Sequence, residues 1–328
     1  MFLKTKLSKI EVEKGIIKKR GLPEGFVITD RNIFERYKNL IKDKKLCFII
    51  TPGEESKSIQ VYTQILNRLA EIEDISAIIA FGGGVVGDIA GFVASTFKRG
   101  VNLIQVPTTL LAMVDSSIGG KNGIDLGMKK NYVGTIYQPK EILIDSSFLD
   151  SLSDREIRNG LAEIIKHSYL LDSPKLIRFK VKVNKDDKDI NEIILKSAEV
   201  KIKIVENDVH DKGLRRSLNF GHTIGHSIEL LYGLSHGEAI SIGMMKEALL
   251  AKRLGFAGNE KINDLKTALI NNNLPIDWPE NSNADEIIKI MECDKKGKFS
   301  FAFDSEHFNE VVDEDSIRFF LKEDINNL

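Results

Sequence analysis

Short runs of apolar, β-branched residues alternate with amphipathic stretches along the first half of the chain. The runs predict buried strands, because each is brief, rich in Ile, Val or Phe, and followed by polar or turn-forming residues. They lie at residues 25–30, 45–50, 75–84 and 101–107. Helical periodicity occupies residues 31–42 and 56–72 and resumes from about Val86. This alternation indicates a mostly parallel sheet with helices on its faces, whose ligands bind beyond the carboxyl ends of the strands.

Long amphipathic segments with few strand signals replace this alternation in the second half. Ser153 and Glu156 fit a capping box that opens a helix carrying Glu163, Lys166 and His167. Further helices are predicted at residues 188–206, 216–232, 237–254, 260–272 and 284–292.

The length agrees with this change of pattern. A chain of 328 residues exceeds the size at which a single hydrophobic core usually stops growing. We therefore expect an α/β nucleotide-binding domain with a mostly parallel sheet at residues 1–150. A mainly α-helical domain that binds metal and substrate is expected at residues 151–328. Hydrophobic residues make up 42% and charged residues 29%, as in ordinary soluble globular proteins.

Charge and cysteine content narrow the expected partners and compartment. Lys and Arg total 47 against 48 acidic residues, so the net charge of -1 gives no reason to expect nucleic acid or an anionic membrane. Cys47 and Cys293 lie far apart in sequence, which suits reduced thiols in a cytoplasmic protein. The first residues lack the continuous apolar run of a secretory signal. We expect a cytoplasmic protein without a membrane partner.

One apolar stretch, residues 77–95, tests that expectation. It is nearly long enough to span a bilayer, and Gly83, Gly87 and Gly91 follow the small-xxx-small spacing of packed membrane helices. Asp88 in its middle and the low helix propensity of a triple glycine argue against a span.

The same stretch contains a glycine motif. Gly82, Gly84 and Gly87 satisfy G-x-G-x-x-G between a predicted strand and a predicted helix, where backbone amides favour a pyrophosphate. The acidic residue expected about 20 positions later for a ribose is missing, so the strict Rossmann fingerprint fails. A nucleotide-phosphate loop of another type and a tight turn for close helix packing both remain open.

Residues 108–139 follow a strand end and look like a long loop. Gly119-Gly120-Lys121 and Lys129-Lys130-Asn131 offer flexible backbone, cations and amides, which suit a small phosphorylated or carboxylated ligand. A loop of this length usually has a function, although a solvated loop would carry lysines similarly.

Three of the six histidines, His222, His226 and His236, lie within fifteen residues. With Glu163 they favour a Glu/His metal site over surface or core histidines, because open catalytic zinc sites commonly have three such ligands. Helical spacing alone favours His222 and His226 as joint ligands of one metal.

Basic residues gather in the same half of the chain. Lys201 and Lys203 share one predicted helix, and Arg215 and Arg216 precede Asn219. Such a group suits an anionic substrate, while a solvated helix face explains Lys203 and Arg216 equally well. Candidates of lower weight are Arg99, Lys295 and Lys296.

Several longer runs of sequence, in a fixed order, carry a specific resemblance. They are GGGVVGDIAGFVASTFKRG, QVPTTLLAMVDSSIGGKNGID, KNYVGTIYQP, GLAEIIKH, LRRSLNFGHTIGHSIE and LSHGEAISIGM. Over most of its length the chain resembles the 3-dehydroquinate synthase family. The resemblance implies a lyase of the shikimate pathway, in aromatic amino acid biosynthesis, that uses NAD and one divalent metal, zinc or cobalt, and is usually a homodimer.

The implied reaction converts 3-deoxy-D-arabino-heptulosonate 7-phosphate to 3-dehydroquinate and phosphate. It proceeds by transient oxidation with NAD, phosphate elimination, re-reduction and aldol cyclisation. The implied metal ligands are Glu163, His222 and His236, which moves His226 to the substrate side.

The resemblance also implies residues for NAD and substrate. Those for NAD are Asp30, Asn32, Glu54, Lys57, Gly84, Val85, Val86, Gly87, Asp88, Thr108, Thr109, Lys121, Lys130, Phe148 and Ser151. Those for substrate and catalysis are Asp115, Lys121, Asn131, Lys166, Lys201, Arg215, Asn219, His226 and one of Lys295 or Lys296. Arg99 would reach the site of the neighbouring subunit.

The chain departs from the family pattern at three places. Ser151 and Asn122 stand where the family usually has threonine, and the segment between His226 and His236 is short. Three rivals follow from the same motifs. They are a related sugar-phosphate cyclase, a metal-dependent polyol dehydrogenase and a non-catalytic NAD-binding protein.

Overall fold

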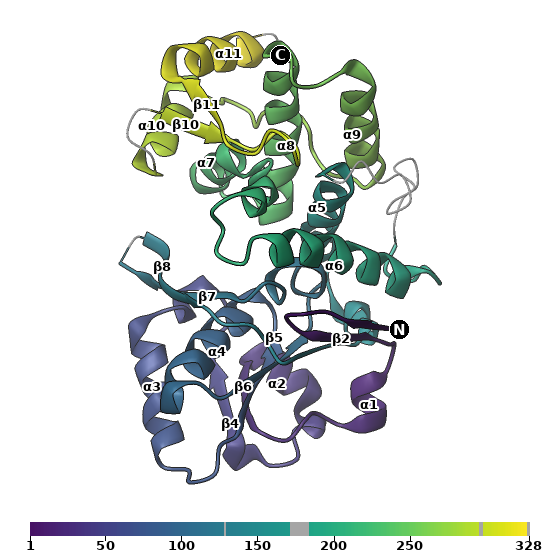
Figure 1. Ribbon diagram of the computed structural model, residues 1–328, viewed down its shortest axis with the longest axis vertical. Helices are drawn as coiled ribbons and strands as arrows, with labels where there is room; N and C mark the ends of the chain where they lie inside the picture. Colours follow the sequence, from purple (N-terminus) through teal and green to yellow (C-terminus); the bar gives the residue numbers. More distant parts are fainter. Residues whose placement is uncertain (128, 171–183, 295–297, 327–328) are drawn as a thin grey trace. The chain divides into compact units, whose positions relative to one another are not determined.

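The computed structural model describes residues 1–127, 129–170, 184–294 and 298–326 (Figure 1). The chain forms two compact units. We call Met1–Gly160 with Lys185–Val209 the sheet unit, and Leu161–Asn184 with His210–Leu328 the helical unit. The domain boundary predicted between residues 150 and 151 stays a prediction.

A seven-stranded sheet forms the centre of the sheet unit. In sheet order its strands are β1 (Phe2–Lys4), β2 (Lys9–Val12), β9 (Glu141–Ile144), β6 (Asn102–Pro107), β5 (Ala77–Gly82), β3 (Phe26–Asp30) and β4 (Cys47–Ile50). All neighbouring strands are parallel except β1 and β2. The predicted, mostly parallel sheet is therefore confirmed, and its four predicted strands are β3, β4, β5 and β6.

Helices follow the strands as the periodicity predicts. Those of the sheet unit are α1 (Ile16–Arg20), α2 (Arg31–Tyr37), α3 (Ile59–Ala70), α4 (Gly84–Thr96) and α6 (Ile190–Asn207), with the start of α5 (Asp154–Leu170). Helix α3 begins where the Ser58 side chain accepts from the Val61 N–H, a regular N-cap. Helix α2 ends at Tyr37, earlier than predicted, because a 3₁₀ turn at Lys38–Leu40 follows it.

The core of this unit explains the continuous apolar run of β5. Every residue of β5 is buried, and Ile78 pairs with Phe26 of β3 and Leu103 of β6. Helix α4 packs against β5 and contributes buried residues such as Ile89 and Val93 to the same cluster. A central parallel strand covered on both faces needs apolar residues at consecutive positions, which is the pattern that residues 75–84 show.

The expectation of a long loop at residues 108–139 is wrong. A π-helical turn occupies Ala112–Ser116, and β7 (Lys121–Leu126) pairs antiparallel with β8 (Lys129–Ile136). The hairpin is drawn in blue-green in Figure 1. Most of β8 is exposed or half-buried, so its sequence lacks the apolar side chains that mark a strand. Gly123 and Gly134 are paired across the two strands, and glycine is uncommon in strands, so it further weakens the sequence pattern that predicts a strand.

The helical unit contains α7 (His222–Tyr232), α8 (His236–Arg253), α9 (Asn259–Asn271), α10 (Ala284–Asp294) and α11 (Glu314–Asn326). These confirm the predicted helices, although a 3₁₀ segment at Leu214–Asn219 precedes α7, so α7 begins later than predicted. A hairpin of β10 (Lys298–Phe301) and β11 (Glu310–Asp313) was not predicted, nor was α11.

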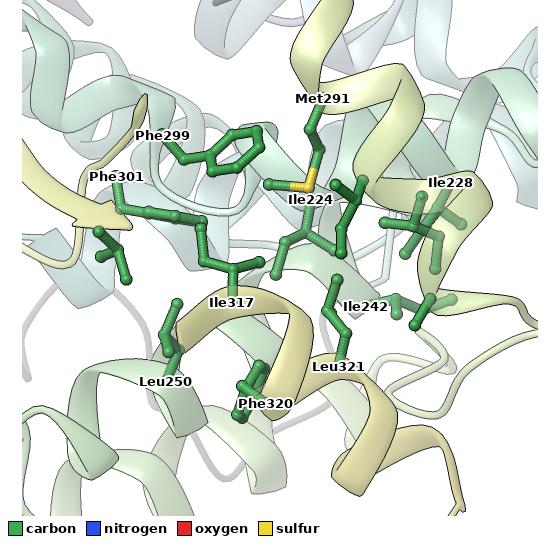
Figure 2. Packing of buried hydrophobic residues seen from close by; sticks show 14 of the residues in the cluster. Ile224, Ile228, Ile242, Leu250, Met291, Phe299, Phe301, Ile317, Phe320 and Leu321 are labelled. Atoms are coloured by element: carbon green, nitrogen blue, oxygen red, sulfur yellow. The ribbon is translucent and has the colours of Figure 1, made fainter. Parts of the chain in front are cut away.

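Figure 2 shows how these elements share one core. Ile224 and Ile228 of α7 belong to the same buried cluster as Ile317 and Leu321 of α11 and Phe299 of β10. The spacing of four residues on each helix places the paired side chains on one face. The start of α7 is therefore held by a packed apolar layer.

The question of a membrane span is addressed by the helices themselves. In the described part of the chain, no helix combines the length and the apolar character that crossing a bilayer requires. Residues 77–95 instead form β5, the glycine turn and most of α4.

Candidate active site

Three side chains of the helical unit converge at the starts of two helices. His222 is the first residue of α7, His236 is the first residue of α8, and Glu163 lies within α5. Their ligand atoms all lie within 4.8 Å of one another. Glu163 Oε1 is 3.2 Å from His236 Nε2 and 3.7 Å from His222 Nε2, and the Glu163 side chain is buried.

The elements that carry these ligands have well-defined starts. The predicted capping box of α5 is confirmed, because the Glu156 N–H donates to Ser153 Oγ and the Ser153 N–H donates to Glu156 Oε2. A second capping box, between Ser235 and Glu238, begins α8 directly at His236.

Burial and neighbouring charges act differently on the two histidines. Burial, followed by the nearby Lys166 ammonium, holds the pKa of His222 well below its usual value, so this imidazole is neutral. Burial also lowers the pKa of His236, but its contacts with Glu163 and Glu229 outweigh this effect and raise the pKa to about 9. Two imidazoles around one buried carboxylate form a donor set that fits a divalent cation such as zinc.

Second partners orient both rings. His222 Nδ1 lies 3.1 Å from the Phe220 carbonyl, and because a carbonyl oxygen only accepts, Nδ1 carries the proton and Nε2 is the ligand atom. His236 Nδ1 lies 3.5 Å from Glu229 Oε2. We did not predict Glu229, although its position two turns after His222 on α7 is a signal that the sequence offered.

His226 lies beside this group but is not part of it. Its ring meets the His222 ring edge-on, with ring centroids 5.1 Å apart. The pair that helical spacing favours is thus not the pair whose ligand atoms converge. Lys166, one turn after Glu163, forms an ion pair with it and is buried.

The glycine turn of the sheet unit connects β5 to α4. Helix α4 begins at Gly84, and its N-cap, Gly83, provides no side-chain cap. The first amides of a helix have no intrahelical acceptor, so they remain available to an anion. A Cβ at Gly87 would come 3.1 Å from Gln105 Oε1, so close packing also explains that glycine.

Four predicted residues meet next to this turn. Lys57 Nζ lies 2.8 Å from Asp88 Oδ2 and 3.2 Å from Glu54 Oε1, and it donates to Asn131 Oδ1. Burial lowers the pKa of Lys57, but Asp88 and Glu54 outweigh it, so the net pKa is raised. The pKa of Asp88 is also raised, because the effect of burial outweighs the opposite effect of the Lys57 ammonium.

Other predicted nucleotide contacts lie at nearby strand ends and turns. Thr108 and Thr109 follow β6 directly, and Val85 and Val86 lie in the first turn of α4. Asp30 caps α2 by accepting from the Ile33 N–H at 3.0 Å, and Asn32 is exposed in the first turn of that helix.

Phe148 and Ser151 belong to one 3₁₀ segment of the same unit. The Phe148 ring is buried and meets the Tyr37 ring edge-on at 5.0 Å. Ser151 Oγ donates to the Phe148 carbonyl at 2.8 Å, so its hydroxyl is oriented by the segment that carries it.

The predicted substrate residues are distributed over both units. Lys201 of α6 lies 2.8 Å from Asp115 Oδ1 and donates to the Asp115 carbonyl at 2.7 Å. Lys121 begins β7 and is exposed, as is Lys130 of β8, which was predicted to bind NAD. Arg99 follows α4 with a positive φ of 65°.

Two further substrate candidates precede α7 in the helical unit. Arg215 is buried in the 3₁₀ segment, and Asn219 is exposed at its end. Lys295 and Lys296 lie outside the described residues.

Two residues that support the Gly119-Gly120-Lys121 turn were not predicted to do so. The Asn122 side-chain amide donates to the Gly120 carbonyl at 2.7 Å, and Gln138 donates to the Gly119 carbonyl at 3.2 Å. Neither contact could be predicted from local periodicity, because both depend on how β7 and the segment after β8 meet.

Comparison with known proteins gives this arrangement a family. The sequence model of the 3-dehydroquinate synthase N-terminal domain matches residues 47–159, and that of the C-terminal domain matches residues 160–297. A 3-dehydroquinate synthase from Clostridium botulinum (strain Alaska E43 / Type E3) is 39% identical over 318 residues, which cover 90% of each chain. The chain belongs to the 3-dehydroquinate synthase family. It is therefore a lyase of the shikimate pathway.

Another member of the 3-dehydroquinate synthase family and two solved structures extend the comparison. The enzyme from Thermodesulfovibrio yellowstonii is 44% identical over 258 residues, 76% of this chain and 72% of its own. A 2-deoxy-scyllo-inosose synthase complexed with carbaglucose-6-phosphate, NAD+ and Co2+ aligns with a TM-score of 0.84 and 24% identity over 97% of both chains. The 2-epi-5-epi-valiolone synthase ValA from Streptomyces hygroscopicus subsp. jinggangensis 5008, with NAD+ and Zn2+ bound, aligns with a TM-score of 0.78 and 21% identity over 99% of both. These structures share the fold.

Proposed function

We propose that the chain converts 3-deoxy-D-arabino-heptulosonate 7-phosphate to 3-dehydroquinate and phosphate, with NAD and one divalent metal, zinc or cobalt. The observation that supports this most directly is the convergence of Glu163, His222 and His236 in a chain 39% identical to a 3-dehydroquinate synthase.

The metal would be held by Glu163, His222 and His236. The fit rests on the donor set, in which a buried carboxylate and two imidazole Nε2 atoms face one another. A bound divalent ion supplies Lewis-acid polarisation of substrate oxygens. Lys166 is paired with Glu163 and would hold that carboxylate in place while presenting its ammonium to the substrate.

NAD would be held at the carboxyl ends of β5 and β6. Its pyrophosphate fits the uncapped amides at the start of α4, around Gly84 to Asp88. Bound NAD supplies a transient hydride acceptor. Lys57, buried among Asp88, Glu54 and Asn131, would fix the walls of this site, and Asp30 and Asn32 at the start of α2 would meet the adenosine.

The substrate's phosphate and carboxylate require cations and polar groups from the chain. Charge-assisted hydrogen bonds to such groups are about twice as strong as neutral ones, which gives Lys and Arg a direct role. We assign this role to Lys121, Lys201, Arg215, Asn131, Asn219 and one of Lys295 or Lys296. His226, whose ring meets the His222 ring edge-on but which is not one of the three ligand candidates, would hold or move a proton, with Asp115 orienting hydroxyl groups.

We further propose that the protein is cytoplasmic and forms a homodimer, in which Arg99 reaches the neighbouring subunit's site. Arg99 is part of a turn of two consecutive positive-φ residues, Lys98 and Arg99, before Gly100. Sedimentation velocity tests the assembly, and a monomer at the concentration of the assay would contradict it.

A substrate comparison tests the proposed reaction. Purified protein with NAD and zinc should release phosphate from the heptulosonate phosphate and form 3-dehydroquinate. Glucose 6-phosphate, which lacks the carboxylate, should release none. Phosphate release from glucose 6-phosphate instead would identify a cyclase for neutral-tailed sugars, and release from neither would overturn the proposal.

A further inference from the structure

Helix α7 begins without a cap from its own sequence. Its N-cap is Gly221, in the left-handed region with φ 80° and ψ -8°, and no side chain near it in sequence accepts from the first turn. The first N–H groups of a helix need acceptors from elsewhere, and an unpaired one is costly when buried. His222, the first residue of this helix, depends on how that end is fixed.

Glu247 supplies the missing cap from α8. Its Oε2 accepts from the Gly221 N–H at 2.7 Å, and its Oε1 accepts from the Ile224 N–H at 2.9 Å. The Glu247 side chain is fully buried. One carboxylate thus makes both hydrogen bonds of a capping box, and its charge lies at the positive end of the helix dipole.

The peptide group between Phe220 and Gly221 links this carboxylate to His222. Its N–H donates to Glu247, and its carbonyl accepts from His222 Nδ1 at 3.1 Å. Because the peptide is planar, an anchor on its N–H also fixes the direction of its carbonyl. Polarisation by the Glu247 carboxylate makes the Phe220 carbonyl a stronger acceptor. This favours the His222 tautomer that carries its proton on Nδ1 and leaves Nε2 unprotonated.

Close packing leaves the start of α7 little room to shift. A Cβ at Gly221 would come 2.9 Å from the Met244 backbone nitrogen, and one at Gly225 would come 3.0 Å from the Ala239 carbonyl oxygen. Helix α8 therefore carries the ligand candidate His236 at its start. Ala239 and Met244 of the same helix pack against α7, and Glu247 lies one turn after Met244.

We propose that Glu247 is a positioning residue of the metal centre, acting through the Phe220–Gly221 peptide on the orientation and tautomer of His222. This inference rests on the proposed role of Glu163, His222 and His236 as metal ligands. Partners behind a metal ligand typically change metal affinity by about 10- to 100-fold. Glu247 differs from the usual such partner because a peptide group stands between it and the imidazole.

A matched control exists in the sheet unit. Asp145 is buried and accepts from the Gly15 N–H at 2.6 Å and the Ile17 N–H at 3.0 Å. Gly15 is the left-handed N-cap of α1, with φ 79°. Glu247→Gln and Asp145→Asn therefore remove the same charge from the same kind of helix start, but only Glu247 lies behind a metal-ligand candidate.

The test is a Co2+ titration of the metal-free full chain against a competing chelator, with the absorption spectrum of bound Co2+ recorded. We expect Glu247→Gln to weaken Co2+ binding by about 10-fold or more and to alter the spectrum, with Asp145→Asn within about twofold of the parent chain. Urea unfolding of both variants without metal shows whether they lose similar stability. Equal Co2+ affinities for the two variants would make Glu247 a helix cap only and overturn the inference.

His222→Ala separates this inference from the proposed metal site. If His222→Ala binds Co2+ as tightly as the parent, the ligand assignment fails, and the inference falls with it. If His222→Ala loses Co2+ while Glu247→Gln does not, only the inference fails. Should Glu247→Gln not fold, Glu247→Asp carries the same test, because the shorter carboxylate cannot reach both N–H groups and should also weaken Co2+ binding.

Discussion

The Lys57 cluster of the sheet unit and the Glu163 cluster of the helical unit both bury charge, but their balance differs. Lys57 is a buried cation with two carboxylates and an amide oxygen around it. Glu163 is a buried carboxylate that faces two imidazoles and Lys166, and of the two imidazoles His222 is held neutral. The first cluster is complete within the chain, whereas the second offers donor atoms to a further cation. We therefore expect substitutions in the first to change stability and substitutions in the second to change metal binding.

The largest expected effect is on the metal centre. His236→Ala should lower zinc affinity by more than about 100-fold, beyond the effect of a residue behind a ligand. His226→Ala is the matched control and should keep one zinc per chain. Metal analysis after desalting measures both. Loss of zinc from His226→Ala with retention in His236→Ala would contradict the ligand assignment.

The next effect concerns stability through Lys57. Lys57→Met should lower the free energy of unfolding by about 3 kcal/mol, because Asp88 and Glu54 are left without their buried cation. Urea unfolding followed by circular dichroism, without NAD, measures this. Lys203→Met is the control, since Lys203 and Glu199 form an exposed ion pair on α6. This substitution should lower the free energy of unfolding by less than about 1 kcal/mol. Equal losses of unfolding free energy in the two variants would show that Lys57 does not compensate the charges of Asp88 and Glu54 as described.

A smaller effect is expected where α4 packs on β7. A Cβ at Gly91 would overlap the Asn122 side chain, whose amide supports the turn before Lys121. Gly91→Ala should therefore cost about 2 kcal/mol by overpacking. Asn122→Ala removes the clash. The double variant should therefore lose less stability than the sum of the losses in the two single variants. Strict additivity in a double-mutant cycle would show that the two side chains do not compete for space.

The smallest effect is expected at the start of α5. Ser153→Ala should cost about 1 kcal/mol by removing the cap, with Ser153→Thr close to the parent chain. Thermal unfolding of the three proteins measures the order. A Ser153→Ala protein as stable as the parent would mean that the capping box contributes nothing.

Local patterns predicted the elements better than the sites. The apolar run at residues 75–84 predicted β5 because a central parallel strand is buried on both faces. The hairpin after Lys121 was missed because its strands are mostly exposed or rich in glycine. The alternation of Phe299, Phe301 and Phe303, all buried, was a usable strand signal for β10 that we did not apply.

The metal centre shows what local patterns leave out. Helical spacing brings His222 and His226 together, but it cannot place Glu163 or His236, because these arrive from other helices through tertiary packing. Glu247 illustrates the same limit, since its partner Gly221 is 26 residues away in sequence.

The most direct test of the central claim measures phosphate, 3-dehydroquinate and NADH in one reaction containing the heptulosonate phosphate, NAD and zinc. Phosphate and 3-dehydroquinate should appear in equal amounts without net NADH, and removing zinc with a chelator should stop both until zinc is restored. NADH that accumulates without phosphate would identify a dehydrogenase and contradict the account.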